Sequence, residues 1–146
     1  MPSSTERILR AFFISNLRHR LFFAKILSCF QSAGDLRKDS FGEAYDLIFV
    51  SAICHMLNPS ENLDLLRKCH TALRTNGRVV VQDFILEADK TAPKSAALFA
   101  LNMLVGTPAG SSYSGEEYAA WFEQAGFHDT RHVRLRGPSS LIIGRK

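Results

Sequence analysis

The stretch Tyr45-Asp46-Leu47-Ile48-Phe49-Val50 decides the fold. It is a short and almost continuous apolar run, which is typical of a strand covered on both faces within a parallel sheet. A similar run returns at residues 78–86, where the β-branched residues Val79, Val80 and Val81 stand together. Parallel strands need a long connection between them, and the intervening residues suffice for a helix. The sequence therefore predicts one right-handed strand–helix–strand crossover over residues 45–86.

Both ends of the intervening helix carry sequence signals. Asn58 can cap the helix, Pro59 suits its first position, and Glu61 can complete a capping box. Asn76-Gly77 supplies a left-handed stop after the helix. These signals predict a helix over residues 59–74. Its apolar face recurs every three or four positions, at Leu63, Leu66, Cys69 and Leu73.

The C-terminal half continues the pattern with two helices and a hairpin. Residues 87–94 are polar and residues 106–113 are rich in Gly, Ser and Pro, which predicts loops around an apolar helix over residues 95–105. Ser114-Gly115-Glu116-Glu117 is a second capping box, and the helix that it starts ends at Gly126. Residues 131–136 and 141–143 then predict a hairpin around Gly137-Pro138. The predicted fold class is α/β: a mostly parallel sheet with a C-terminal antiparallel hairpin and helices on both faces.

Composition limits the classes of protein that the chain can belong to. The 146 residues are 46% hydrophobic and 22% charged, which predicts a soluble globular chain with no membrane span. The net charge of +4 comes from residues 1–33, which hold five basic residues and one acidic residue. The remaining body is neutral, so we expect no nucleic-acid partner. Residues 1–33 are basic and apolar and predict an amphipathic N-terminal helix, with a mitochondrial presequence as the alternative.

The cysteines indicate a reducing compartment. Cys29, Cys54 and Cys69 are an odd number and form no Cys-x-x-Cys motif, which favours free thiols and a cytoplasmic location. Cys54-His55 and Cys69-His70 have neither the spacing nor the number of ligands of a known metal pattern. We therefore expect no metal site.

The order of these motifs resembles the C-terminal part of the class I S-adenosylmethionine-dependent O-methyltransferases, a family of plant phenolic enzymes and bacterial small-molecule enzymes. Gly34-Asp35-Leu36 is similar to the Gly-Asp pair after the family's third strand, and Tyr45–Val50 to its fourth strand. Ile53-Cys54-His55 resembles the segment with the catalytic histidine. The match continues through residues 65–86, and residues 115–127 are similar to the last helix with its Ala-Gly-Phe ending.

The resemblance covers residues 34–146 and implies a partial Rossmann-like methyltransferase domain there. Residues 1–33 then form a separate N-terminal segment. S-adenosylmethionine is the implied cofactor, and Gly34, Asp35, Leu36 and Ser51 are its implied binding residues. In this reading Asp35 accepts a hydrogen bond from the adenine amino group and Leu36 packs on the purine. Asp35 as a turn residue that binds a nearby backbone N–H is the alternative.

The resemblance also implies the catalytic residues. His55 would be the general base that takes the proton of a small hydroxylated, aromatic acceptor, and Asp83 would orient it. Asp83 is one carbon shorter than the family's glutamate, and a second acid of the family is replaced near Ser112. His55 follows the end of a parallel strand, where open α/β sheets bind ligands. The acceptor walls of the family correspond to Phe99, Met103, Tyr113 and Trp121.

Structural roles remain as alternatives for these residues. His55 can pack within its loop, Asp83 can cap the end of its strand, and aromatic residues at helical spacing are often plain core. The chain also departs from the family, because it has neither the glycine-rich turn after the first strand nor the ribose-binding acid. Two functions follow: an O-methyltransferase, or an inactive remnant that acts as a binding module. The remnant would associate, as a homo-oligomer or with another chain, through a sheet edge left unfilled by missing strands.

Overall fold

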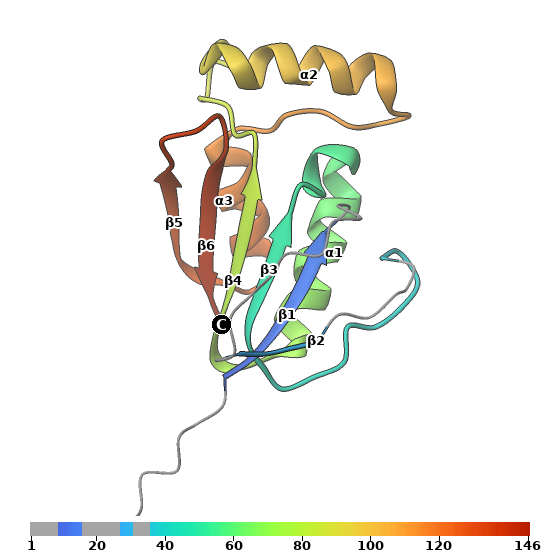
Figure 1. The fold of residues 1–146 in the computed structure, drawn as a ribbon, viewed down its shortest axis with the longest axis vertical. Coiled ribbons are helices and arrows are strands. Elements are labelled where there is room, and N and C mark those ends of the chain that lie inside the picture. The colour runs from blue at the N-terminus through green and yellow to red at the C-terminus, as the bar shows by residue number, and fades with distance from the viewer. Residues whose placement is uncertain (1–8, 16–26, 31–35) are drawn as a thin grey trace, which may run out of the picture.

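The computed structural model describes residues 9–15, 27–30 and 36–146. The strands of these residues lie in one sheet with the order β2-β1-β3-β4-β6-β5 (Figure 1). Strands β1 to β4 pair in parallel, and β6 pairs antiparallel with both β4 and β5. This confirms the predicted α/β class, with a mostly parallel sheet and a C-terminal antiparallel hairpin. The strands are β1 (Leu9–Ser15), β2 (Leu27–Phe30), β3 (Tyr45–Ser51), β4 (Leu73–Asp83), β5 (His128–Arg134) and β6 (Ser140–Arg145).

Helix α1 (Pro59–Ala72) joins β3 to β4, and its predicted capping box is present. The Asn58 side chain accepts from the backbone N–H of Glu61, and the Glu61 carboxylate accepts from the backbone N–H of Asn58. The helix ends at Ala72, before the predicted residue 74, because Leu73 is extended and already pairs with β3. Asn76 is the left-handed residue, with φ at 64°, but it lies inside β4 and does not stop the helix.

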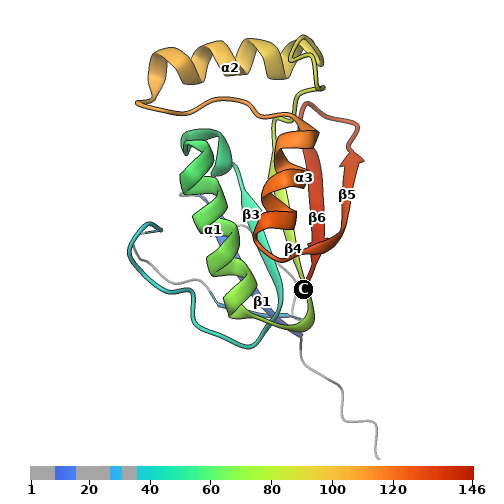
Figure 2. The same cartoon turned by 180° about the vertical axis from the view of Figure 1, so that it is seen from behind.

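Helix α3 (Gly115–Gln124) packs beside α1 on the same face of the sheet (Figure 2). Its predicted capping box between Ser114 and Glu117 is present, and Gly126 follows the helix with φ at 93°, in the region that favours glycine. Under the two helices lies a core whose largest fully buried members include Tyr118 and Phe122. Gly144 of β6 packs directly against the Phe122 ring. The sheet contributes to this core the fully or almost fully buried residues Ile48, Val50, Val79, Val81 and Ile142.

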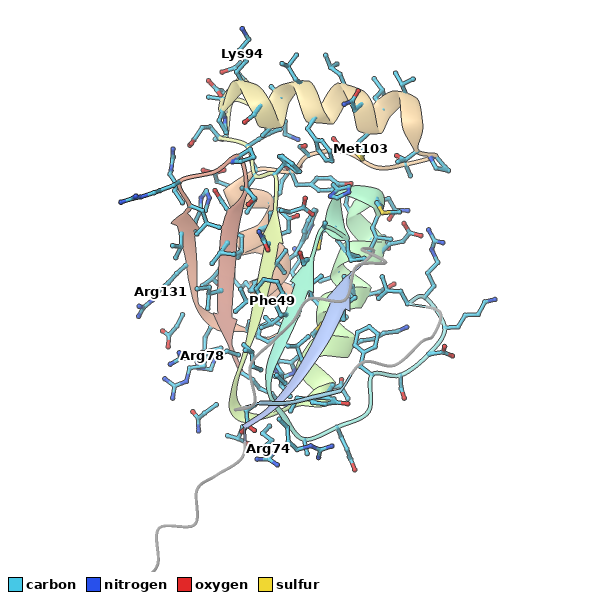
Figure 3. All side chains as sticks on the ribbon, in the orientation of Figure 1. Phe49, Arg74, Arg78, Lys94, Met103 and Arg131 are labelled. Atoms are coloured by element: carbon cyan, nitrogen blue, oxygen red, sulfur yellow. The ribbon has the colours of Figure 1, made fainter. Side chains whose placement is uncertain are left out.

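Helix α2 (Lys94–Gly106) lies across the carboxyl ends of β3 and β4 and not on a face of the sheet (Figures 1 and 2). Many of its side chains project away from the rest of the molecule (Figure 3). Ala96 is the buried residue of this helix. The most exposed large apolar side chains of the described residues all lie on α2, at Leu98 (55%), Leu101 (59%), Leu104 (74%) and Val105 (89%).

The described helices therefore cover one face and one end of the sheet, where helices on both faces were expected. Phe49 of β3 points to the face opposite α1 and α3 and is half-buried (Figure 3). Val80 pairs with it and is also half-buried, whereas their neighbours along the strands, Ile48 and Val79, are fully buried under the helices.

The expected N-terminal helix is wrong for two parts of residues 1–33. Leu9–Ser15 and Leu27–Phe30 are strands, and the other residues of that segment lie outside the described part. Short apolar runs fit a helix or a strand equally well by periodicity, and here sheet pairing decides. The expectation of an unfilled edge beside β3 is also wrong, because β1 pairs with β3 and β2 pairs with β1. The division of the chain at residue 34 stays a prediction.

Candidate active site

The carboxyl ends of β1, β3 and β4 lie together at one edge of the sheet (Figure 1). Ser15 of β1 pairs with Ser51 of β3, which pairs with Gln82 of β4. From β1 the chain proceeds outward to β2, and from β3 it proceeds in the other direction to β4, so the strand order reverses between β1 and β3. Open α/β sheets bind ligands outside the carboxyl ends of strands at such a reversal. The topology therefore points to Ser51 and the residues after it as a ligand-binding edge.

His55 and Asp83 meet at this edge. Ser51 ends β3, and the 3-10 turn η1 (Cys54–Met56) follows and carries His55. The backbone N–H of His55 donates to Asp83 Oδ2 over 3.0 Å, and His55 Nδ1 lies 2.7 Å from Asp83 Oδ1. His55 is 8% exposed and Asp83 is 2% exposed. The shorter side chain of aspartate therefore reaches the imidazole, and the structure brings the two predicted residues together.

The contact with Asp83 determines what the imidazole can do. A carboxylate at Nδ1 favours the tautomer with its proton on that nitrogen, which leaves Nε2 free to accept a proton. The neighbouring thiol of Cys54 offers no competing nucleophile, because only a thiolate is strongly nucleophilic. Burial, reinforced by the negative charge of Asp83, raises the pKa of the Cys54 thiol well above its ordinary value. The pair is therefore suited to proton transfer by the histidine.

Aromatic rings from two segments lie beside the imidazole. The Phe99 ring of α2 meets the His55 ring edge to face, with centroids 4.9 Å apart. Phe84, which follows Asp83, stacks on Phe99 at 4.1 Å and an angle of 21°. These rings place a flat apolar surface next to the polar pair. An aromatic molecule can pack on such a surface while a hydroxyl group faces the histidine.

The predicted cofactor residues are only partly described. Gly34 and Asp35 lie outside the described residues. Leu36 is half-buried and borders a cavity of about 160 Å³, whose lining also includes Arg37, Leu57, Glu61, Asp64, Leu65 and Lys68. The hydroxyl of Ser51 donates to Gln82 Oε1 over 3.4 Å at the carboxyl edge. The structure thus places Ser51 at the predicted edge and Leu36 against α1.

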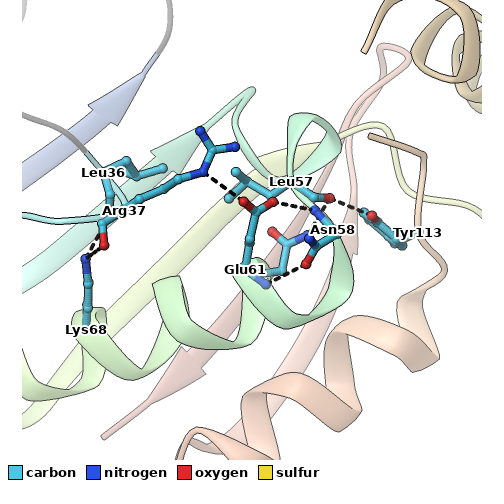
Figure 4. A network of polar contacts seen from close by, with 8 residues as sticks. Leu36, Arg37, Leu57, Asn58, Glu61, Lys68 and Tyr113 are labelled. Carbon is cyan, nitrogen blue, oxygen red and sulfur yellow. Dashed lines mark hydrogen bonds and ion pairs between the residues drawn. The ribbon is translucent and has the colours of Figure 1, made fainter. Parts of the chain in front are cut away.

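Polar contacts hold the segment after Asp35 on α1 (Figure 4). The Lys68 ammonium donates to the backbone carbonyls of Leu36, Arg37 and Asp39 at 2.8 to 3.1 Å. Arg37 Nε donates to Glu61 Oε1 over 2.8 Å. The bond from the Asn58 backbone lowers the pKa of the Glu61 carboxyl, and Arg37 lowers it further. Glu61 therefore links this segment to the N-terminus of α1.

Comparison with known proteins identifies the family. Residues 13–128 match the O-methyltransferase domain family. The chain belongs to the O-methyltransferase family. It is 39% identical over 102 residues to PigF of Serratia sp. (strain ATCC 39006), which is named an S-adenosyl-L-methionine-dependent methyl transferase. The aligned residues cover 70% of this chain and 29% of PigF. A solved structure of PigF with SAH matches with a TM-score of 0.72 and 36% identity, over 77% of this chain and 34% of that chain.

A second relative of this O-methyltransferase chain is the 3-hydroxy-5-methyl-1-naphthoate 3-O-methyltransferase of Streptomyces sahachiroi. The identity is 36% over 117 residues, which is 79% of this chain and 34% of that enzyme. The chain therefore spans about one third of the length of the curated relatives that it matches.

The residues predicted as acceptor walls of the O-methyltransferase domain separate into two groups. Phe99 lies beside His55, and Met103 is half-buried on α2. Tyr113 and Trp121 instead pack in the core with Tyr118, with ring centroids 4.9 to 6.4 Å apart. Ser112 is 1% exposed, and its hydroxyl has no hydrogen-bond partner among the described residues.

Asn62 is a residue of the candidate site that the sequence analysis did not predict. The buried face of α1 consists of Asn62, Leu65, Leu66, Cys69 and Ala72, which includes Leu66 and Cys69 of the predicted face. Asn62 lies four residues before Leu66 and therefore stands on this face, and a polar residue at that spacing is the signal that the sequence offers. The Asn62 side chain is completely buried and contacts the His55 turn.

Other kinds of site find no support in the described residues. No group of three or more His, Cys, Asp or Glu side chains there is arranged to hold a metal ion. No helix in the same residues has the length and apolarity needed to cross a membrane. Cys54 and Cys69 are buried free thiols.

Proposed function

We propose that this chain is the C-terminal catalytic-domain portion of an S-adenosylmethionine-dependent O-methyltransferase that acts on a hydroxyl group of a small aromatic molecule. The observation that carries the proposal is the 2.7 Å contact between His55 and Asp83 at the carboxyl edge of the sheet. Membership of the O-methyltransferase family supports the reaction type. The histidine supplies the proton acceptor that methylation of a neutral hydroxyl group needs.

His55 removes the proton of the acceptor in this proposal. A phenol has a pKa of about 10 and is a poor nucleophile until it loses its proton. With Nδ1 of His55 held by Asp83, Nε2 takes that proton as the oxygen gains the methyl group. General-base catalysis of this kind contributes about 10² to 10⁴-fold in rate. Asp83 then stabilises the positively charged imidazole.

Residues at the strand reversal would hold the cofactor. S-adenosylmethionine supplies, when bound, a methyl group on a positively charged sulfur. Ser51 lies at the reversal of strand order, which fits a nucleotide-containing ligand. Ser51 would contact the adenosyl part together with Gly34, Asp35 and Leu36. The first glycine of the chain is Gly34, so no glycine-rich turn follows β1, and we expect weak binding.

An aromatic acceptor fits the surroundings of His55. Phe84 and Phe99 offer a flat apolar surface beside the imidazole. One relative is named for the methylation of a hydroxyl group on a naphthoate, which is a planar aromatic acid. These observations support a planar phenolic acceptor.

Calorimetric titration with S-adenosylhomocysteine tests the proposal, because this product needs no acceptor to bind. We expect binding at least about 30-fold weaker than that of PigF under the same conditions, because hydrogen bonds worth about 1 kcal/mol or more each are missing. Transfer of a radiolabelled methyl group to a panel of phenols and naphthols then tests catalysis. A folded chain that binds no S-adenosylhomocysteine would contradict the enzyme proposal.

The alternative is a methyltransferase-like binding module without activity. Two observations favour it: residues 9–33, from β1 onward, contain no glycine for a glycine-rich turn, and α2 exposes large apolar side chains that suit a protein contact. This alternative predicts a folded chain that keeps the contact between His55 and Asp83 and associates through α2, but does not bind S-adenosylhomocysteine. The same titration therefore separates the two functions.

A further inference from the structure

The turn that carries His55 has two short-range backbone hydrogen bonds, from the Met56 N–H to the Ile53 carbonyl over 2.9 Å and from the Leu57 N–H to the Cys54 carbonyl over 3.2 Å. η1 comprises three residues, and Ile53 before it makes no side-chain capping bond. Leu57 after it is already extended. A single turn of 3-10 helix has poor hydrogen-bond geometry and is stable only when its surroundings fix it. The position of the His55 imidazole against Asp83 therefore depends on groups outside the turn.

Asn62 of α1 binds the turn on both sides of His55. Its Nδ2 donates to the backbone carbonyl of Cys54 over 3.0 Å and to that of Leu57 over 3.2 Å. Cys54 immediately precedes His55, and Leu57 follows the turn. One amide group therefore fixes the beginning and the end of the segment whose centre is the imidazole.

The orientation of the Asn62 amide follows from its partners. Two carbonyl oxygens face it, so the NH₂ group must point toward them, because an amide oxygen there would be repelled. The Asn62 Oδ1 atom has no hydrogen-bond partner among the described residues, although the side chain is completely buried. A buried unpaired oxygen is unfavourable. Packing alone therefore does not explain an asparagine at this position. Its contribution to the structure is the two hydrogen bonds that it donates to the turn.

Two groups from the loop before α3 complete the support. The Tyr113 hydroxyl donates to the Leu57 carbonyl over 2.6 Å, so this carbonyl accepts from both Tyr113 and Asn62 (Figure 4 shows the Tyr113 bond). The backbone N–H of Ser111 donates to the carbonyl of His55 itself over 2.9 Å. The turn is thus held from α1 on one side and from residues 111–113 on the other.

We propose that Asn62 is a positioning residue for His55: it fixes the 3-10 turn so that the backbone N–H and Nδ1 of His55 both reach Asp83. Tyr113 acts in the same way through the Leu57 carbonyl. The inference rests on the proposed function for the meaning of His55 as a base. Its geometry, however, can be tested without cofactor or acceptor.

Amide hydrogen exchange, followed residue by residue by NMR, tests this role. The backbone N–H of His55 exchanges only when its bond to Asp83 Oδ2 opens, so its exchange rate reports release from Asp83. The backbone N–H of His70, in the last turn of α1, serves as an internal reference for global unfolding. Loss of both Asn62 bonds in Asn62→Leu should raise the ratio of the His55 rate to the His70 rate by about 30-fold.

Leu66→Ala is the matched control, because Leu66 lies on the same face of α1, is 1% exposed and makes no hydrogen bond with the turn through its side chain. It should destabilise the fold and leave the ratio unchanged. Tyr113→Phe removes one hydroxyl and should raise the ratio by about fivefold, and it carries the test if Asn62→Leu does not fold. Asp83→Asn gives the upper limit of this ratio, because it removes the charged partner of His55.

Equal ratios in Asn62→Leu and Leu66→Ala would overturn the proposal, because Asn62 would then only stabilise the fold. An unchanged ratio in Tyr113→Phe, when Asn62→Leu is unfolded, would overturn it as well. Neither result depends on S-adenosylhomocysteine binding. Failure of the proposed function and failure of this inference are therefore distinguishable.

Discussion

Asp83 accepts three hydrogen bonds in an almost completely buried position. Its Oδ2 accepts from the backbone N–H of His55, and its Oδ1 accepts from the backbone N–H of Phe84 and lies against the His55 ring. A buried carboxylate is tolerable only when such donors satisfy it. The two backbone donors remain when the imidazole is removed, so a change at His55 should leave the fold and Asp83 in place.

The first prediction concerns His55→Ala. With a neutral phenolic acceptor, turnover should fall by about 10²-fold or more, because no group then takes the proton. An acceptor that is already ionised at the assay pH should lose much less. Methyl transfer from labelled S-adenosylmethionine measures both, and calorimetry should show unchanged S-adenosylhomocysteine affinity. Equal losses for the two acceptors would show that His55 is structural.

The second prediction concerns Tyr113→Phe and pH. Loss of one net hydrogen bond to Leu57 should lower the free energy of unfolding by about 1 kcal/mol near pH 7. Burial, with help from the charge of Glu117, raises the pKa of Tyr113 to about 12, above the ordinary value of 10. The folded state therefore keeps this proton while the unfolded state loses it.

The stability that Tyr113 provides is therefore fully present below pH 10 and is lost as the pH rises toward 12. Urea unfolding of both proteins at several pH values measures this difference. A difference that stays constant from pH 8 to about 12 would contradict the assignment.

At the scale of elements, the sequence predicted the capped ends of the helices, because capping depends on residues that are close together in the chain. The capping boxes at Asn58 and Ser114 and the left-handed Gly126 are short-range features, and the structure shows all three. The predicted apolar face of α1 is buried at Leu66 and Cys69, but Leu65 is buried where Leu63 was expected, because leucines occur at positions 63, 65 and 66 and several apolar faces fit them. Which of these faces is buried depends on the sheet and α3, and therefore on tertiary contacts.

The third prediction concerns the contact between β6 and α3. A methyl group at Gly144 would overlap the Phe122 ring, which is fully buried. Gly144→Ala should therefore lower the free energy of unfolding by about 1–3 kcal/mol, as overpacking does in other cores. Gly106→Ala is the control, because nothing lies within 4 Å of the added methyl group. Equal stability of the two variants in urea would contradict this account.

At the scale of the whole molecule, the sequence did not predict the complete order of the strands in the sheet. His55 and Asp83 were predicted correctly as neighbours, because His55 follows one of two adjacent parallel strands and Asp83 ends the other. β1 and β2 were not predicted, because a short apolar run forms a strand only when it pairs with the edge of a sheet. The geometry of the candidate site was thus predictable where it depends on one crossover, and could not be predicted where distant segments contribute.

The fourth prediction concerns self-association, which we expect through α2 and not through the edge beside β3. Residues 95–115 carry no charged side chain, so nothing on α2 after Lys94 repels a second copy. Leu104→Lys should reduce concentration-dependent association in sedimentation velocity, because Leu104 is 74% exposed. Leu135→Lys changes the net charge equally at another exposed leucine and should not. An unchanged protein that stays monomeric at high concentration would contradict this expectation.

The small number of residues between His55 and Asp83 in the sequence has a consequence for the order of folding. The two residues are 28 positions apart within one crossover, whereas Tyr113 lies 56 positions from Leu57. Contacts of low sequence separation form at a lower entropic cost. In pulse-labelled hydrogen exchange during refolding, we expect the backbone N–H of His55 to become protected before that of Ser111. The histidine–aspartate pair would then form early in folding, and residues 111–113 would add their hydrogen bonds to it later.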